Sequence, residues 1–342
     1  MQNRTLPTLI AMAAATLFNA GIVHGQKPYK VEQKWVIGGD GTWDYVTVDS
    51  AAHRLYIAHQ TRAQVVDLTT GKLAGTIEGL TKSHGIVILP DGKTGFLSDG
   101  GANKVVAFDT STLAKIAEIS AGTNPDGMAY EPTTKTLWAF NSSSKNVSVI
   151  DVATRTVVAS ISLPGKPEFP AVDGAGTVYV NIEDKNSVVR LDAKTHTITA
   201  TWPLTGCESP SGLAIDPAAG RLFSVCDGKR MAITDTHTGK SLGTPQIGDG
   251  PDATAFNPMR KLAFSSNENG TLTVIDTAKP GFPVIQSVPT MKGARTMALD
   301  TVTGKIYTVS AKLGTPPATA PGGHARPTAI PGTFTVLVIG QN

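Results

Sequence analysis

A unit of roughly 41 residues recurs along most of this chain, and repeats of this length are typical of solenoids and propellers. Each unit reads as a strand, a turn, a second strand, a looser loop, a third strand, a turn and a fourth strand. Six of the third strands end in an aspartate: Asp67, Asp109, Asp151, Asp192, Asp235 and Asp276. In five of them a Thr follows three residues later, which predicts a tight turn whose N–H groups the Asp carboxylate accepts. Because the same role recurs in six units, we assign these aspartates to the scaffold.

The second strands of the repeat number seven and are rich in β-branched and aromatic residues, as strands require. They read RLYIAH, TGFLSD, TLWAFN, TVYVN, RLFSVC, KLAFSS and KIYTVS. The last unit ends after TFTVLVIG and lacks a fourth strand, whereas residues 29–39 supply a strand outside the repeat. Pairing these two ends closes a ring and removes an open sheet edge. The sequence therefore predicts an all-β, seven-bladed propeller of four-stranded antiparallel blades over residues 26–342. A linear β-solenoid, the alternative, would leave the strand at 29–39 unexplained.

The chain resembles the YVTN-repeat β-propeller family, which includes the YncE-like exported bacterial proteins. The matching residues are the Asp-x-x-Thr turns, the Pro-Asp-Gly at 125–127, the Pro-Ser-Gly at 210–212 and TVYVN at 177–181, although the verbatim YVTN tetrapeptide is absent. The resemblance covers nearly all of residues 29–340 and implies the propeller architecture. It implies no catalytic residue, because propellers serve as enzymes, binding proteins and scaffolds alike.

The N-terminus has the pattern of a secretory signal peptide over residues 1–25. Arg4 gives a positive start, an apolar stretch runs from Leu6 to Phe18, and small residues precede an expected cleavage after Gly25. We therefore expect a periplasmic or secreted protein without a membrane span in the mature chain. In an oxidising compartment the two cysteines, Cys207 and Cys226, are expected to form a disulfide, since they flank one predicted hairpin. A thiol nucleophile or soft-metal pair is the alternative.

The net charge of +3 is small for 342 residues, and Lys and Arg form no basic run. This pattern gives no reason to expect nucleic-acid binding, which needs a basic stripe with interleaved aromatic residues. We expect a monomer whose partner is a protein or small-molecule ligand that the sequence does not identify.

Two rings of polar residues are predicted at one mouth of the central channel. The first opens each first strand and consists of Asp44, His84, Asp126, Glu168, Ser211, Asp252 and Arg295. The second ends each second strand and consists of His59, Asp99, Asn141, Asn181, Cys226, Ser266 and Ser310. Four acids with one Arg and one His should repel one another, so some pKa values should rise or a cation should bind. A solvated structural channel is the simpler interpretation of both rings.

One insertion breaks the repeat in the last blade, at residues 313–332. It is rich in Pro and Gly, and its polar residues include His324 and Arg326. Its position places it on the face with the variable loops, where a lid or docking loop is one interpretation and a tolerated flexible insertion the other.

The sequence favours a non-catalytic binding or scaffold protein that uses the variable face of its channel. The alternative is a metal-dependent propeller hydrolase or lyase, similar to lactonases, with a divalent cation held by Asp126, Glu168, Asn141 and Asn181. No ligand motif with fixed spacing identifies a cofactor, and no residue is assigned a catalytic role.

Overall fold

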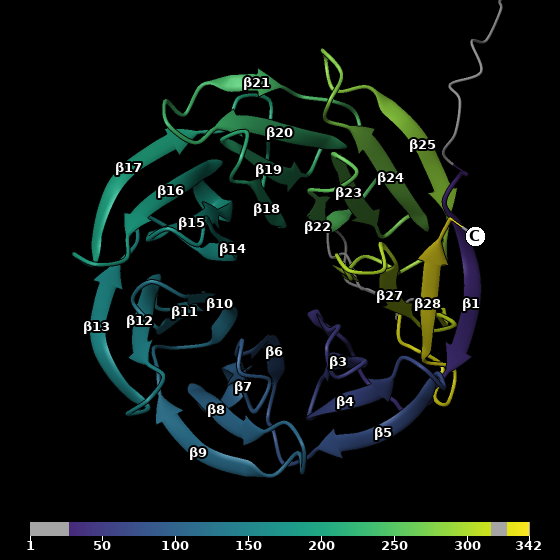
Figure 1. Ribbon diagram of the computed structural model, residues 1–342. Helices are drawn as coiled ribbons and strands as arrows, with labels where there is room; N and C mark the ends of the chain where they lie inside the picture. The colour runs from purple at the N-terminus through teal and green to yellow at the C-terminus, as the bar shows by residue number, and fades with distance from the viewer. Residues whose placement is uncertain (1–26, 316–326, 342) are drawn as a thin grey trace, which may run out of the picture.

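The computed structural model describes residues 27–315 and 327–341, and these fold into seven four-stranded antiparallel sheets around a central channel (Figure 1). The sheets are the blades of a β-propeller, as predicted. The predicted signal peptide (1–25) and residues 316–326 of the predicted insertion, which include His324 and Arg326, lie outside the described residues. Within the part that is described, no helix is long and apolar enough to span a bilayer.

Each of the first six blades uses four strands that are consecutive in the sequence. Blade 1 consists of β2 (Val46–Asp49), β3 (Arg54–His59), β4 (Arg62–Asp67) and β5 (Lys72–Ile77). Blade 2 consists of β6 (Ser83–Ile88), β7 (Thr94–Asp99), β8 (Lys104–Asp109) and β9 (Lys115–Ser120). Blade 3 consists of β10 (Pro125–Glu131), β11 (Thr136–Asn141), β12 (Asn146–Asp151) and β13 (Thr156–Ser162). Blade 4 consists of β14 (Pro167–Val172), β15 (Thr177–Ile182), β16 (Ser187–Asp192) and β17 (Thr197–Pro203).

Blade 5 consists of β18 (Leu213–Asp216), β19 (Arg221–Cys226), β20 (Arg230–Asp235) and β21 (Ser241–Gly243). Blade 6 consists of β22 (Pro251–Asn257), β23 (Leu262–Asn267), β24 (Thr271–Asp276) and β25 (Val284–Pro289). Short 3₁₀ turns η1 (Gly100–Ala102) and η2 (Glu183–Lys185) follow the second strands of blades 2 and 4.

Blade 7 closes the ring with both ends of the chain. It consists of β26 (Met297–Leu299), β27 (Ile306–Ser310), β28 (Thr335–Gly340) and β1 (Lys30–Val36). β1 pairs antiparallel with β28, from Lys30 opposite Gly340 to Val36 opposite Thr335, and Figure 1 shows the two strands side by side at the rim. The prediction of circular closure by residues 29–39 is confirmed, and the linear solenoid is wrong.

The core lies between neighbouring blades, and among the described residues each of the seven interfaces holds one apolar cluster. At the closing interface, Leu55 and Ile57 of β3 pack with Tyr307 and Val309 of β27. Because strand side chains alternate between two faces, each blade buries both faces against its neighbours. Closure is therefore needed for the first and last blades to bury both of their faces.

The repeated aspartates form the predicted turns. The Asp151 carboxylate accepts the N–H groups of Ala153 and Thr154 and the Thr154 hydroxyl. The same contacts recur at Asp67, Asp109, Asp192 and Asp235. These carboxylates hold the turns on the plain face of the ring, away from the variable loops.

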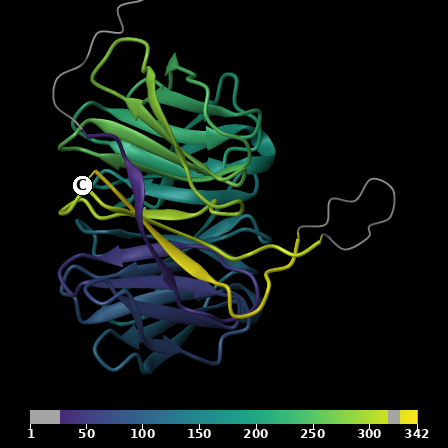
Figure 2. The same cartoon turned by 90° about the vertical axis from the view of Figure 1, so that its right-hand side faces the viewer.

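The described ends of the 313–332 insertion extend from the opposite face of the ring (Figure 2). Leu313 and Ala329 form an antiparallel bridge, and Gly314 N–H donates to the Thr328 carbonyl at 2.9 Å. This short ladder places Leu313, Thr328 and Ala329 beside the channel mouth.

Candidate functional site

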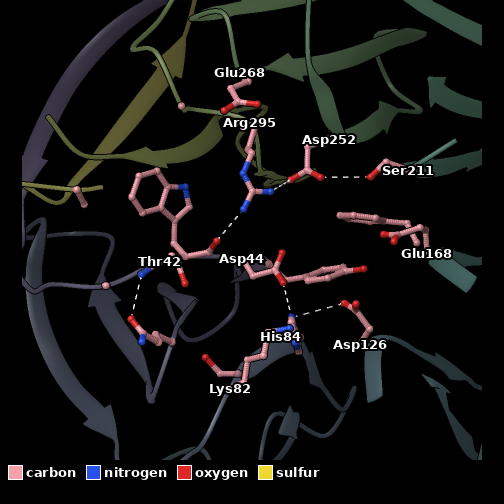
Figure 3. Close-up of a pocket in the computed structure, with 18 of the residues that line it drawn as sticks. Thr42, Asp44, Lys82, His84, Asp126, Glu168, Ser211, Asp252, Glu268 and Arg295 are labelled. Atoms are coloured by element: carbon pink, nitrogen blue, oxygen red, sulfur yellow. Dashed lines mark hydrogen bonds and ion pairs between the residues drawn. The ribbon is translucent and has the colours of Figure 1, made fainter. Parts of the chain in front are cut away.

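One pocket of about 720 Å³ occupies the channel mouth on the variable face. It is lined by all seven residues of the predicted first ring, one from each blade: Asp44, His84, Asp126, Glu168, Ser211, Asp252 and Arg295. Figure 3 shows their side chains pointing inward from around the ring. Repetition of one strand position around a closed ring is what gathers these residues, which lie 40 or more positions apart in the sequence.

A local irregularity in the innermost strands aims several of these side chains. The strand register shifts between Ser83 and Ile86, between Pro125 and Met128, between Pro167 and Pro170, and between Pro251 and Ala253. His84, Asp126, Glu168 and Asp252 lie within these shifted segments. A bulge bends the strand and redirects its side chains, so the site residues lie where the sheet pairing is interrupted.

Glycines beside the ring residues let neighbouring blades approach closely at the bulges. A Cβ added to Gly85 would lie 2.6 Å from the Asp126 carbonyl oxygen, and one added to Gly212 would lie 2.6 Å from the Asp252 carbonyl oxygen. Both distances are too short for any side chain, which explains the X-Gly pairs that open these strands. The glycines therefore bring ring residues of adjacent blades together.

Asp44, His84 and Asp126 form a cluster that spans blades 1 to 3. His84 Nδ1 contacts the Asp44 carboxylate and lies 3.7 Å from Asp126 Oδ1. Burial lowers the pKa of His84, but its hydrogen bond to Asp44 and the charge of Asp126 outweigh that effect and raise it overall. Burial and the Asp44 charge raise the pKa of Asp126 to about 6.

Glu168 and Lys166 form an ion pair on blade 4. Lys166 Nζ lies 2.8 Å from Glu168 Oε1 and also contacts Glu183, which follows β15. Burial and the Asp126 carboxylate nevertheless raise the pKa of Glu168 to about 8. The pKa of Glu168 is raised further than that of Asp126, so Glu168 is the better proton donor of the two, and carboxyl pairs with separated pKa values favour acid–base chemistry.

Arg295 connects the far side of the pocket to blades 1, 5 and 6. Its guanidinium donates to the Asp252 carboxylate at 2.8 Å and to the Trp43 carbonyl at 3.0 Å. The Asp252 carboxylate also accepts the Ser211 hydroxyl at 3.2 Å. The pocket therefore has one half arranged around His84 and one around Arg295, as Figure 3 shows.

Two aromatic rings lie across the channel beneath these polar groups. Tyr45, just before β2 of blade 1, stacks on Phe169 of β14 in blade 4, with ring centroids 4.2 Å apart. A Cβ added to Gly127 would lie 2.8 Å from the Tyr45 hydroxyl, so the glycine makes room for this crossing. Burial and four surrounding carboxylates, of which Asp126 acts most strongly, raise the pKa of Tyr45 well above its ordinary value.

Comparisons with known proteins agree with this architecture. Residues 47–182 match the SMP-30/Gluconolactonase/LRE-like region family. The chain is 30% identical over 200 residues to the YncE protein of Escherichia coli strain K12, which covers 53% of this chain and 56% of that protein. It is 28% identical over 151 residues to YncE of Salmonella typhimurium strain LT2, covering 42% of each.

Solved structures show the same fold at low sequence identity. The WD40 repeats of RRP9 superpose with a TM-score of 0.76 at 10% identity, over 92% of this chain and 99% of that one. Kuenenia stuttgartiensis hydrazine synthase gives a TM-score of 0.67 at 18% identity, over 80% of this chain and 92% of that one. The chain is thus similar in sequence to YncE over about half of its length. Its fold is a seven-bladed β-propeller. The chain spans about half the length of the curated relatives that it matches.

The second predicted ring does not line the channel-mouth pocket. Among the described residues that line the pocket, none belongs to that ring. Asn141 donates to Asn146 and Ser148 within blade 3, whereas Asn181 donates to the carbonyls of Ser211 and Gly212 in blade 5. Both side chains are fully buried. The metal set that combined them with Asp126 and Glu168 is therefore not brought together in the pocket.

The other members of the second ring also have structural partners. The Asp99 carboxylate accepts the N–H groups of Thr81 and Lys82, and His59 contacts Gln64 at 2.6 Å. Ser266 donates to the Arg295 carbonyl and Ser310 to the Lys292 carbonyl. Asp99 and Ser310 thus hold the loop that enters their own blade, and Ser266 holds the loop that enters the next blade. His59 contacts the neighbouring strand β4 of its own blade. A ligand-binding role for them stays a prediction.

Cys226 of the same ring is joined to Cys207 by a disulfide, with the two Cα atoms 5.2 Å apart. Both cysteines are buried in the cluster between blades 4 and 5. The bond fixes the loop that precedes β18 to the end of β19.

Several further residues line the pocket that were not predicted from the sequence: Trp43, Tyr45, Lys82, Lys166, Glu183 and Glu268. Lys166 lies two residues before Glu168, so strand alternation alone would have placed the two on one side. Tyr45 had no comparable signal, because its contact with Phe169 depends on the diameter of the closed ring.

Proposed function

We propose that this β-propeller is a binding protein that holds a small polar ligand in the channel-mouth pocket. The observation that carries the proposal is the convergence of one side chain from each blade on a single pocket of about 720 Å³. This volume is typical of small-molecule sites, which combine a few polar groups with apolar walls. Here Trp43, Tyr45 and Phe169 supply flat apolar surfaces beside the carboxylates and Arg295.

Melting-temperature measurements with defined compounds test this function. The wild-type mature protein and its Ser211→Trp variant are each mixed with sugars, sugar lactones, amino acids or diamines. The substitution places an indole in the pocket. Lys194→Trp is the matched control, since Lys194 is exposed on a turn of the plain face. We expect at least one compound to raise the melting temperature of the wild type and the control, but not of Ser211→Trp. Equal shifts in all three proteins, or no shift with any compound, would contradict the proposal.

A metal-dependent hydrolase or lyase is the second candidate. It is favoured by the match of residues 47–182 to the SMP-30/Gluconolactonase/LRE-like region and by the separated pKa values of Asp126 and Glu168. Hydrolysis of a lactone panel, abolished by chelator and by Glu168→Gln, would support this activity. Absence of turnover in protein reloaded with Mn²⁺ or Zn²⁺ would count against it.

We also propose that the protein acts outside the cytoplasm. The signal-peptide pattern of residues 1–25 and the disulfide between Cys207 and Cys226 both support export. N-terminal sequencing of the protein from a bacterial periplasmic or secreted fraction should begin at Gln26. An intact Met1 in a cytoplasmic fraction would contradict it.

A further inference from the structure

The Asp44, His84 and Asp126 cluster offers three ligand atoms that converge on one point of the pocket. One imidazole nitrogen and two carboxylate oxygens all lie within 4.8 Å of one another. Ligands bonded to one ion at about 2.1 Å lie about 3–4 Å apart, so small side-chain shifts would bring all three into one coordination sphere. The three residues come from adjacent blades, so the closed ring holds their backbones in fixed positions.

The donor set selects a class of ion. Carboxylates suit hard cations and imidazole suits borderline transition metals, so a mixed set favours Mn²⁺, Fe²⁺ or Zn²⁺ over Ca²⁺ or Mg²⁺. Three protein ligands on one side of an ion leave coordination positions free on the other side. Here that side is the pocket, which Asp44, His84 and Asp126 all line.

The Tyr45 hydroxyl is an independent indication of a bound group at this point. Its oxygen is buried and has no hydrogen-bond partner among the described residues, and it lies beside Gly127, the chain neighbour of Asp126. A buried hydroxyl without a partner is costly, and such atoms in native sites commonly contact a water or ligand that completes the site. A water bound to an ion in this cluster would be such a partner.

The charge balance of the pocket favours a cation as well. Among the described lining residues, six are acidic and three are Lys or Arg. Lys166 contacts Glu168 and Glu183, and Arg295 contacts Asp252, so these two bases are paired on other parts of the wall. The third base, Lys82, lies near His84 and lowers the pKa of both His84 and Asp126 through its charge, so it offsets part of the negative charge of the cluster. Among the described residues, His84 is the ion-pair partner that Asp44 and Asp126 have in common.

We propose that Asp44, His84 and Asp126 bind one divalent transition-metal ion, with open coordination positions that face the pocket. This ligand set differs from the one predicted from the sequence, since it replaces Glu168, Asn141 and Asn181 with residues of the two preceding blades. The proposal does not depend on an organic ligand, because the three side chains converge without one.

Metal titration of the tag-free mature protein, stripped with chelator, tests the site. Calorimetry with Zn²⁺ and electron paramagnetic resonance with Mn²⁺ should each detect one ion per chain. Asp126→Asn and His84→Gln should each weaken binding about 100-fold or more, because each removes a direct ligand. Glu268→Gln is the matched control, because it removes the same charge from the same pocket, whereas Glu268 lies beside Arg295 (Figure 3). The metal affinity of this variant should stay within about threefold of the wild-type value.

Circular dichroism and melting curves establish that each variant is folded, and Asp44→Asn replaces any variant that is not. Absence of binding at millimolar metal would overturn the proposal. So would binding that survives both ligand substitutions, or that Glu268→Gln weakens as much as Asp126→Asn does.

Discussion

The guanidinium of Arg295 lies 2.8 Å from the Asp252 carboxylate, and the same group donates to the Trp43 carbonyl of blade 1. Both charged side chains are less than one-fifth exposed. Arg295 lies in the loop that leads from β25 into β26 of blade 7. Its ion pair joins this loop to blade 6, and its hydrogen bond to Trp43 joins the loop to blade 1, where the ring closes.

Removing Arg295 should destabilise the protein as well as alter the pocket. Arg295→Met removes the ion pair to the largely buried Asp252 and the hydrogen bond to the Trp43 carbonyl, so we expect a loss of about 2–4 kcal/mol in unfolding free energy. Urea denaturation measures this loss. Lys104→Met, which removes the exposed pair with Glu118, should cost clearly less than Arg295→Met does, because solvent screens that pair. Equal losses in the two variants would refute a special role for Arg295.

Glu168 should make stability depend on pH across the neutral range. Its pKa is raised from an ordinary 4.5 to about 8, so the folded state holds this proton more tightly than the unfolded chain. The resulting stability is complete below about pH 4.5 and is lost as the pH rises through about 8. Relative to the wild type, Glu168→Gln should therefore gain up to about 4 kcal/mol between pH 5 and 8.5, measured by urea denaturation in the presence of chelator.

Glu118→Gln is the control for that measurement. Glu118 is exposed, and its contact with Lys104 lowers its pKa, so it does not titrate in this range. Its stability curve should follow that of the wild type. If Glu168→Gln also follows the wild type from pH 5 to 8.5, the carboxyl of Glu168 is not held protonated.

Tyr29 should anchor the closing strand. Its ring is buried and packs edge-on against Phe264 of blade 6 at 5.3 Å, and its backbone exchanges two hydrogen bonds with the Gln286 side chain. Tyr29→Ala should lower the unfolding free energy by about 3 kcal/mol, in line with loss of a buried aromatic ring. Hydrogen exchange should then show faster opening of β1. Lys34→Ala, at an exposed position of the same strand, should leave both measurements unchanged within about 0.5 kcal/mol.

The disulfide should stabilise the loop before β18. Its cysteines are 19 residues apart, for which the chain-entropy estimate gives about 3 kcal/mol. Cys207→Ala with Cys226→Ala should therefore melt several degrees lower than the oxidised wild type. Dithiothreitol should lower the melting temperature of the wild type toward that of the double variant and leave the double variant unchanged. If the fully reduced wild type melts at the same temperature as the oxidised wild type, the disulfide does not stabilise the protein.

The repeat made the architecture predictable because it is a local property. Asp151 and Thr154 form their turn through contacts within four residues, and the same contacts recur in other blades. Counting seven second strands and one unpaired strand at 29–39 was then sufficient to predict the closure of β1 on β28. The first ring followed from the same periodicity, since equivalent strand positions must meet around a closed channel.

The pairing within the pocket was decided only by the tertiary structure. Asn141 and Asn181 have the residue type of ligands and the correct repeat position, yet their amides hydrogen-bond to neighbouring strands and carbonyls instead. The contact of His84 with Asp44 and Asp126, and the stacking of Tyr45 on Phe169, depend on bulges, on glycine contacts between blades and on the ring's diameter. Sequence periodicity predicted both rings at the channel mouth, but only the first ring lines the pocket, because contacts and distances across the channel arise only when all seven blades pack together.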